Sequence, residues 1–137
     1  MQPDRHRTAG LWLNGAAQDI AIARAGMALW PSAACFHAQQ AAEKALSAAL
    51  VVRCGDVVRT HALTVLEAEL REAGVDADER TLGALRTLDK YYAPTRYPDA
   101  LGDVDPTTAF TESEAIDAIE RAECVIAFAK GLVDEDR

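Results

Sequence analysis

The chain has 137 residues, 50% of them hydrophobic, and a formal net charge of −8 at pH 7. We expect a single helical domain over residues 1–137, with a loose leader over residues 1–7 and a loose tail over residues 134–137. The acidic balance excludes broad nucleic-acid binding, which needs a basic surface. Because no apolar run reaches the length of a membrane span and no signal peptide is recognisable, we expect a cytoplasmic protein without membrane contact.

Two long helices are predicted in the first part of the chain. The first covers residues 8–29, where the apolar residues of one face are Leu13, Ala16, Ala17, Ile20, Ala23 and Met27. Trp30 and Pro31 interrupt this pattern, and Pro31 suits the first turn of a second helix. We expect that helix to run from Ser32 to Arg53 or Cys54 and to end at Gly55.

Two shorter helices follow. Thr60 is the predicted N-cap of the third helix, which closes at Gly74. Asp76 and Glu79 have the spacing of a capping box for the fourth helix, and Pro94 stops that helix. The stripes are Leu63, Leu66, Leu70 and Ala73 in the third helix, and Leu82, Leu85, Leu88 or Asp89, and Tyr92 in the fourth.

A long loop and a last helix complete the pattern. Residues 93–110 are rich in proline, and long loops of this kind are often functional. Thr111 and Glu114 form a second predicted capping box, which opens a helix with the stripe Ile119, Ala122, Ile126, Ala129 and Val133. The chain therefore predicts an all-α, up-and-down bundle of four or five helices, framed by the first two and the last.

Polar residues are concentrated on the second helix, in residues 36–46. This stretch has the composition of a helix, yet it carries His, two Gln, Glu and Lys among alanines. His37, Gln40 and Lys44 follow the spacing of one helical face. That face predicts either a polar ridge lining a cleft beside Arg96 or a hydrogen-bonded dimer seam.

The loop after the fourth helix supplies the other candidates. The guanidinium of Arg96 could fork onto a phosphate, or it could pair with Asp99 or Asp103 and staple the loop. Tyr92 and Tyr97 could stack on a base or pack at the edge of the bundle. Asp99 could accept a ribose hydroxyl or form a turn. The candidate ligand-binding residues are Arg96, Tyr97, Asp99, Tyr92, Lys44, Gln40 and His37.

No catalytic, metal or cofactor site is predicted. Nothing acidic lies three positions before His37 or His61, as a di-metal bundle would need, and no Ser or Cys has a triad companion. The three cysteines, Cys35, Cys54 and Cys124, lack metal-ligand spacing and are expected to be free.

Three further polar residues, Glu43, His61 and Arg59, are expected to have structural roles. Glu43 is expected to face solvent or to bond Arg53 or a partner helix. His61 and Arg59 flank the expected N-cap of the third helix, where ordinary capping is favoured over binding of an anion.

Three segments together resemble the HEPN domain family (higher eukaryotes and prokaryotes nucleotide-binding). They are residues 36–46, Thr60-His61-Ala62-Leu63, and Tyr92 followed by Arg96-Tyr97-Pro98-Asp99, and the similarity extends from about Ala9 to Leu132. The resemblance implies an up-and-down helical bundle that commonly dimerises. It also implies a nucleotide such as ATP or GTP as ligand and, in many prokaryotic members, a minimal nucleotidyltransferase as partner.

The resemblance leaves more than one function open. Ribonucleases of the family, often toxins of toxin–antitoxin systems, use an Arg and a His four to six residues apart. Neither Arg53 nor Arg59 has this spacing to His61, and no His follows Arg96. We therefore favour a nucleotide-binding or nucleotidyltransferase-partner module, homodimeric and without its own catalysis.

The alternatives concern the same residues. In a metal-independent RNase, His37 or Tyr97 would act with Arg96 across a dimer. In a pure interaction protein, the polar residues would serve dimerisation or partner docking.

Overall fold

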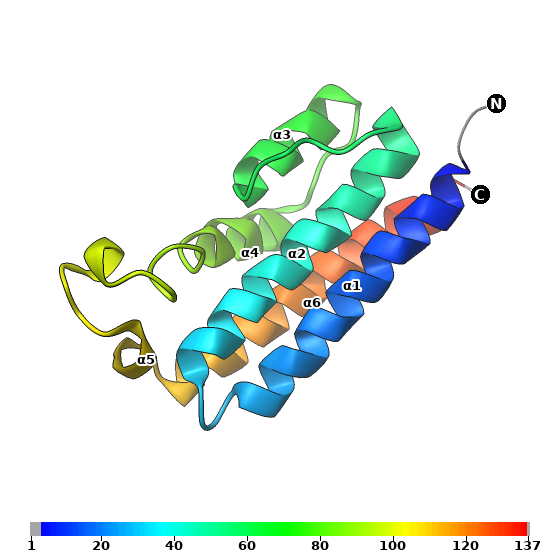
Figure 1. The fold of residues 1–137 in the computed structure, drawn as a ribbon. Coiled ribbons are helices and arrows are strands. Elements are labelled where there is room, and N and C mark those ends of the chain that lie inside the picture. The colour runs from blue at the N-terminus through cyan, green and yellow to red at the C-terminus, as the bar shows by residue number, and fades with distance from the viewer. Residues whose placement is uncertain (1–3, 137) are drawn as a thin grey trace.

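The computed structural model describes residues 4–136, and every regular element in that range is a helix. The long helices are α1 (Arg5–Gly26), α2 (Pro31–Cys54) and α6 (Glu112–Glu135), which lie side by side (Figure 1). The shorter elements are α3 (Leu63–Glu72), α4 (Glu79–Asp89), the 3-10 helix η1 (Pro98–Leu101) and α5 (Pro106–Ala109). The predicted all-α fold, framed by the first two helices and the last, is confirmed.

Helix α2 is the centre of the bundle. It contacts α1, α3, α4, α5 and α6, and most of its residues are buried. Its alanines, such as Ala38, Ala42 and Ala45, are fully buried, and small side chains of this kind let neighbouring helices approach closely. No helix among residues 4–136 has both the length and the apolar character to cross a membrane.

The ends of the long helices differ from the predicted ends by a few residues. Helix α1 begins at Arg5 rather than Thr8, because the carboxylate of Asp4 accepts hydrogen bonds from the backbone N–H groups of His6 and Arg7. Part of the predicted leader is therefore helical, and residues 1–3 lie outside the described residues. Helix α1 ends at Gly26 instead of residue 29, and α6 continues through Glu135 into the predicted tail.

Three predicted helix boundaries are confirmed. Pro31 occupies the first turn of α2. Gly55 ends that helix in the left-handed region (φ 85°), with its N–H donating to the carbonyl of Val51. Thr111 and Glu114 form the expected reciprocal capping box at the start of α6.

The caps of α3 and α4 were predicted incorrectly. Helix α3 begins at Leu63, and the Thr60 hydroxyl accepts a hydrogen bond from the N–H of Ala62 instead of capping the helix. The cap comes from α4, where the Asp89 carboxylate accepts from the N–H groups of Leu63 (2.6 Å) and Thr64 (3.2 Å).

At α4, the capping residue is Asp78 and not Asp76. The Asp78 carboxylate accepts from the N–H of Thr81 at 2.7 Å, and these hydrogen bonds lower the pKa of Asp78 below its usual range. The predicted capping box of Asp76 and Glu79 is wrong because α4 begins at Glu79, so the capping position falls to Asp78, the residue immediately before it.

Asp89→Ala should lower the free energy of unfolding by about 1–2 kcal/mol, because it removes the cap of α3 and one tie between α3 and α4. Urea unfolding followed by circular dichroism measures the change. Asp76→Ala is the matched control, since it removes the same charge from an exposed position that does not cap α4. Equal unfolding midpoints for the two variants would contradict the capping role.

The three cysteines are free, as predicted, and differ in exposure. Cys35 is fully buried, Cys54 is exposed and Cys124 is half-buried. Burial raises the pKa of the Cys35 thiol to about 12, and the nearby carboxylates of Glu114 and Asp117 act in the same direction.

In the folded protein, Cys54 should react rapidly with a disulfide reagent at mildly alkaline pH, whereas Cys35 should react only after denaturation. The reason is that the thiolate is the reactive species and Cys35 is both buried and held as a thiol. Thiol titration of the wild type and of the double variant Cys54→Ser/Cys124→Ser, which keeps only Cys35, before and after adding denaturant, assigns the reaction of Cys35. Rapid labelling of the folded double variant would overturn this prediction.

Candidate functional site

Arg96 is held against three aromatic rings. Its guanidinium carbon lies 4.2 Å from the ring centroid of Tyr92, 4.5 Å from that of Phe36 and 4.8 Å from that of Tyr97. The Arg96 Nε also donates a hydrogen bond to the Tyr92 carbonyl at 3.2 Å. These cation–π contacts orient the guanidinium without neutralising its charge.

The turn after α4 produces this arrangement. The backbone N–H groups of Arg96 and Tyr97 both donate to the carbonyl of Ala93, and the buried Thr95 hydroxyl donates to the carbonyl of Tyr91. The chain therefore coils back after Pro94 instead of extending away from the bundle. The coil brings Arg96 over the ring four residues before it and over Phe36 of α2.

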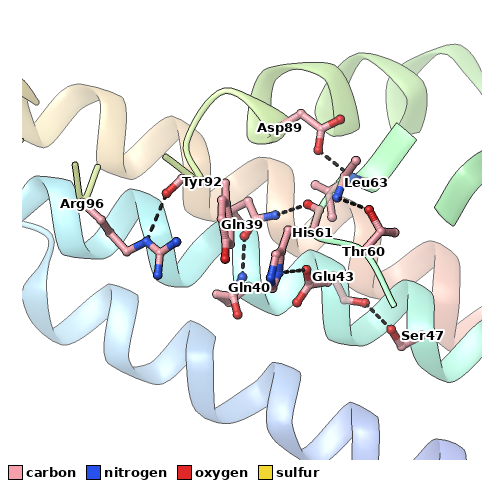
Figure 2. A network of polar contacts seen from close by, with 11 residues as sticks. Gln39, Gln40, Glu43, Ser47, Thr60, His61, Leu63, Asp89, Tyr92 and Arg96 are labelled. Atoms are coloured by element: carbon pink, nitrogen blue, oxygen red, sulfur yellow. Dashed lines mark hydrogen bonds and ion pairs between the residues drawn. The ribbon is translucent and has the colours of Figure 1, made fainter. Parts of the chain in front are cut away.

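His61 lies against the same tyrosine. Its ring stacks on Tyr92, with centroids 4.2 Å apart and planes at 19°. Figure 2 shows Tyr92 between Arg96 and His61, so both faces of its ring are in contact with a neighbour. The row of three side chains joins the connection before α3 to the turn after α4.

Glu43 of α2 orients His61. The Nδ1 atom of His61 lies 2.8 Å from Glu43 Oε1, and the Glu43 side chain is only 14% exposed (Figure 2). The expectation that Glu43 faces solvent or bonds Arg53 is therefore wrong, because Arg53 pairs with Glu135 at the end of α6. The carboxylate lies under the connection before α3, where the His61 ring is its hydrogen-bond partner.

The environment of Glu43 favours a positively charged partner. Burial raises the pKa of the Glu43 carboxyl above its ordinary value, while the hydrogen bond and charge of His61 lower it, as does the charge of Lys44. A cationic His61 therefore stabilises the ionised carboxylate of Glu43.

Gln39 fixes the backbone on which His61 lies. Its side chain is fully buried, and its Nε2 donates to the His61 carbonyl at 2.9 Å. Its Oε1 accepts from the Nε2 of Gln40 at 2.7 Å, which places the predicted Gln40 in this network (Figure 2). The connection before α3 is therefore bonded to α2 through both the backbone carbonyl and the side chain of His61.

His37 and Lys44 point to a different neighbour, Asp19 of α1. The Asp19 side chain is 7% exposed, with Oδ1 2.8 Å from His37 Nδ1 and Oδ2 2.6 Å from Lys44 Nζ. Gly15 gives the lysine room, since a Cβ there would lie 3.0 Å from Lys44 Cδ. This polar group joins α1 to α2 inside one chain.

The predicted site residues therefore fall into separate groups. Arg96, Tyr92 and Tyr97 are together, and His37 reaches their edge through Phe36, whose ring centroid is 5.3 Å away. Lys44 belongs to the Asp19 group.

Asp99 is exposed at the start of η1. Within residues 4–136, neither Asp99 nor Asp103 forms an ion pair with Arg96, and the buried Nη2 of Arg96 has no hydrogen-bond partner. The loop-stapling alternative for Arg96 is therefore not what the structure shows.

Sequence reasoning missed Asp19, His61 and Glu43 as members of these groups. The pairing of Asp19 could have been predicted from the sequence, because an acidic residue beside Ile20 on an otherwise apolar helix face needs a partner. No sequence pattern could have predicted the pairing of His61 with Glu43, since the two residues lie on different elements.

Surface cavities differ in the charge of their lining. One of about 690 Å³ lies beside Tyr92 and is also lined by His61, Lys90 and Pro94. Another, of about 630 Å³ between α4 and α6, is lined by three carboxylates, Asp78, Glu120 and Glu123, and one arginine, Arg80, so its net negative charge would repel an anion. No cluster of three or more His, Cys, Asp or Glu side chains suited to a metal ion occurs in the described range.

Comparisons with known proteins agree with this fold. The sequence pattern of the HEPN domain matches residues 9–132. The crystal structure of TT1696 from Thermus thermophilus is 37% identical, with 90% of this chain and 97% of that chain covered and a TM-score of 0.84. ST0689, described as an archaeal HEPN homologue, is 29% identical, with 91% and 97% covered and a TM-score of 0.76. No curated protein matches significantly. The chain belongs to the HEPN domain family, as the three sequence segments predicted.

Proposed function

We propose that this protein is a nucleotide-binding HEPN module, homodimeric or paired with a nucleotidyltransferase, without catalysis of its own. The observation that carries the proposal is the Arg96 guanidinium, which contacts three aromatic rings while its buried Nη2 has no partner within residues 4–136. A planar guanidinium of this kind suits the oxygens of a phosphate.

The energetics support an anionic ligand at Arg96. A buried N–H without a partner costs about 1–3 kcal/mol, so a phosphate oxygen that contacts Nη2 after a shift of the side chains covering it would remove a cost already present in the free protein. The aromatic rings restrict the side chain before binding, so less rotamer freedom is lost when the ligand arrives.

The remaining groups suggest how the rest of a nucleotide would lie. Because Arg96 and His61 cover the two faces of Tyr92, Tyr97 is the ring available for a base, and it is 48% exposed. The cavity of about 690 Å³ on the His61 side of Tyr92 has the size of small-molecule sites, about 300–1,000 Å³, but Arg96 and Tyr97 are not among its lining residues, so it would hold only a part of the ligand that extends past Tyr92. Asp99, two residues after Tyr97, is the proposed acceptor for a ribose hydroxyl.

The second-helix candidates would play a smaller part. His37 and Gln40 would border the ligand from α2, whereas Lys44 is held by Asp19 and would contribute through the packing of α1 on α2. Exposed apolar side chains between α1 and α2, Leu29 (78% exposed) and Trp30 (59%), offer a surface for self-association or for a partner.

Arg96→Gln should weaken ATP or GTP binding by about 1.5–3 kcal/mol, roughly a 10- to 150-fold rise in Kd, because a charge-assisted hydrogen bond to phosphate is lost. Calorimetric titration measures the change. Arg86→Gln is the control, since it removes the same charge from an exposed position on α4. The proposal fails if the wild type gives no heat with either nucleotide, or if both variants bind equally well.

A metal-independent RNase is the second candidate, and the pairing of His61 with Glu43 favours it. A carboxylate on Nδ1 orients a histidine as a general base, and the His61 side chain is 58% exposed to a substrate. This base would replace His37, whose Nδ1 is also held by a carboxylate but whose side chain is only 28% exposed. Arg96 would stabilise the charge on the phosphate.

If the protein is an RNase, it should cleave total RNA in the presence of a chelator, and His61→Asn should reduce the rate by about 100-fold or more because the general base is lost. Gel analysis of the products measures this. The matched variant His6→Asn, near the start of α1, should cleave at the wild-type rate. Intact RNA after incubation with the wild type, or equal cleavage by His61→Asn, would eliminate this candidate.

A further inference from the structure

A groove runs along the connection between α2 and α3, on the side facing the start of α1. Two surface cavities, of about 540 and 340 Å³, share the lining residues Trp12, Val57 and Arg59 and are therefore adjacent. The first cavity is also lined by Arg5 and the second by His61. In Figure 1 the start of α1 lies beside the end of α2.

The groove has an apolar floor with an indole. Val51 of α2 is 5% exposed, and Trp12 and Val57 are half-buried. Trp12 lines both cavities, so it lies between them. A half-buried indole at the centre of a groove provides a flat surface for a ring.

Arg5 is fixed at one end of this groove. Its Nη1 donates to the Val52 carbonyl at the end of α2, at 3.3 Å. Gly55 makes room for it, because a Cβ at that position would lie 2.8 Å from Arg5 Nη2. The guanidinium is therefore held by a neutral carbonyl, and its charge stays available to a ligand.

Arg59 supplies a second positive charge on the same cavity. It is exposed, and among residues 4–136 no carboxylate forms an ion pair with Arg59 or Arg5. Two carboxylates also line these cavities, Asp56 the first and Glu43 the second. Asp56 accepts from the N–H of Val57 and Glu43 is bonded to His61, and neither of the two forms an ion pair with Arg5 or Arg59. In a chain with a net charge of −8, this groove keeps two cations without an acidic partner.

We propose that this groove is a second ligand site, distinct from the Arg96 cluster, for a phosphate carried by a flat ring, as in a nucleoside monophosphate. The phosphate lies between Arg5 and Arg59, and the ring lies on Trp12. Arg96 lines neither cavity, so the site does not depend on the function proposed above.

Tryptophan fluorescence tests the proposal in the intact protein. The chain has two tryptophans, and Trp30→Phe changes an exposed one, which leaves Trp12 as the reporter. Titration with AMP should quench this signal saturably, and inorganic phosphate alone should compete only weakly because it lacks the ring. Adding Arg59→Gln should raise the apparent Kd at least about tenfold, while Arg96→Gln or Arg86→Gln should leave it unchanged.

The opposite results overturn the proposal. Absence of a saturable change at Trp12 removes the site. A Kd that rises with Arg96→Gln but not with Arg59→Gln assigns the nucleotide to the Arg96 cluster alone, and competition by phosphate as strong as by AMP removes the role of Trp12. Circular dichroism confirms that each variant is folded, which is expected because Arg59 and Trp30 are exposed.

Discussion

The burial of α2 is the constraint on which the rest of the structure depends. This helix contacts neighbours on several sides, and most of its residues are buried, so each polar side chain on it needs a partner inside the protein. On the side facing α1, Asp19 supplies the partner for His37 and Lys44. On the side facing α3, His61 supplies the partner for Glu43, and its carbonyl accepts from the buried Gln39. The polar stripe is thus two sets of contacts that hold different elements on α2.

The second set of contacts builds the candidate site. Because Glu43 and Gln39 hold the connection before α3, His61 has a fixed place against Tyr92. Tyr92 in turn supports Arg96, whose other contacts come from the turn after α4 and from Phe36. The groups that would meet a ligand are therefore oriented by buried contacts, and such preorganisation favours binding because less freedom is lost when a ligand arrives.

The sequence predicted what depends on neighbouring residues and missed what depends on distant ones. The left-handed Gly55 and the capping box at Thr111 are local patterns, and both are confirmed. Asp89 caps α3 from the end of a different helix, so no spacing within α3 could identify it. The same reason hid the pairing of His61 with Glu43, because the predicted helices carry no information on which of their faces meet.

The lack of an acidic partner at Arg96 among the described residues bears on whether this residue has a binding role or a structural one. A half-buried cation normally acquires an acidic partner, and this chain has 22 acidic residues against 14 Lys and Arg. The other half-buried Lys and Arg side chains follow that expectation: Lys44 pairs with Asp19, Arg53 with Glu135 and Arg121 with Asp117. Among residues 4–136, Arg96 is the half-buried exception, held by rings and a carbonyl. A staple for the loop would gain stability from a carboxylate, whereas a phosphate site would lose affinity to one, so the aromatic neighbours of Arg96 fit the proposed phosphate site better than a staple.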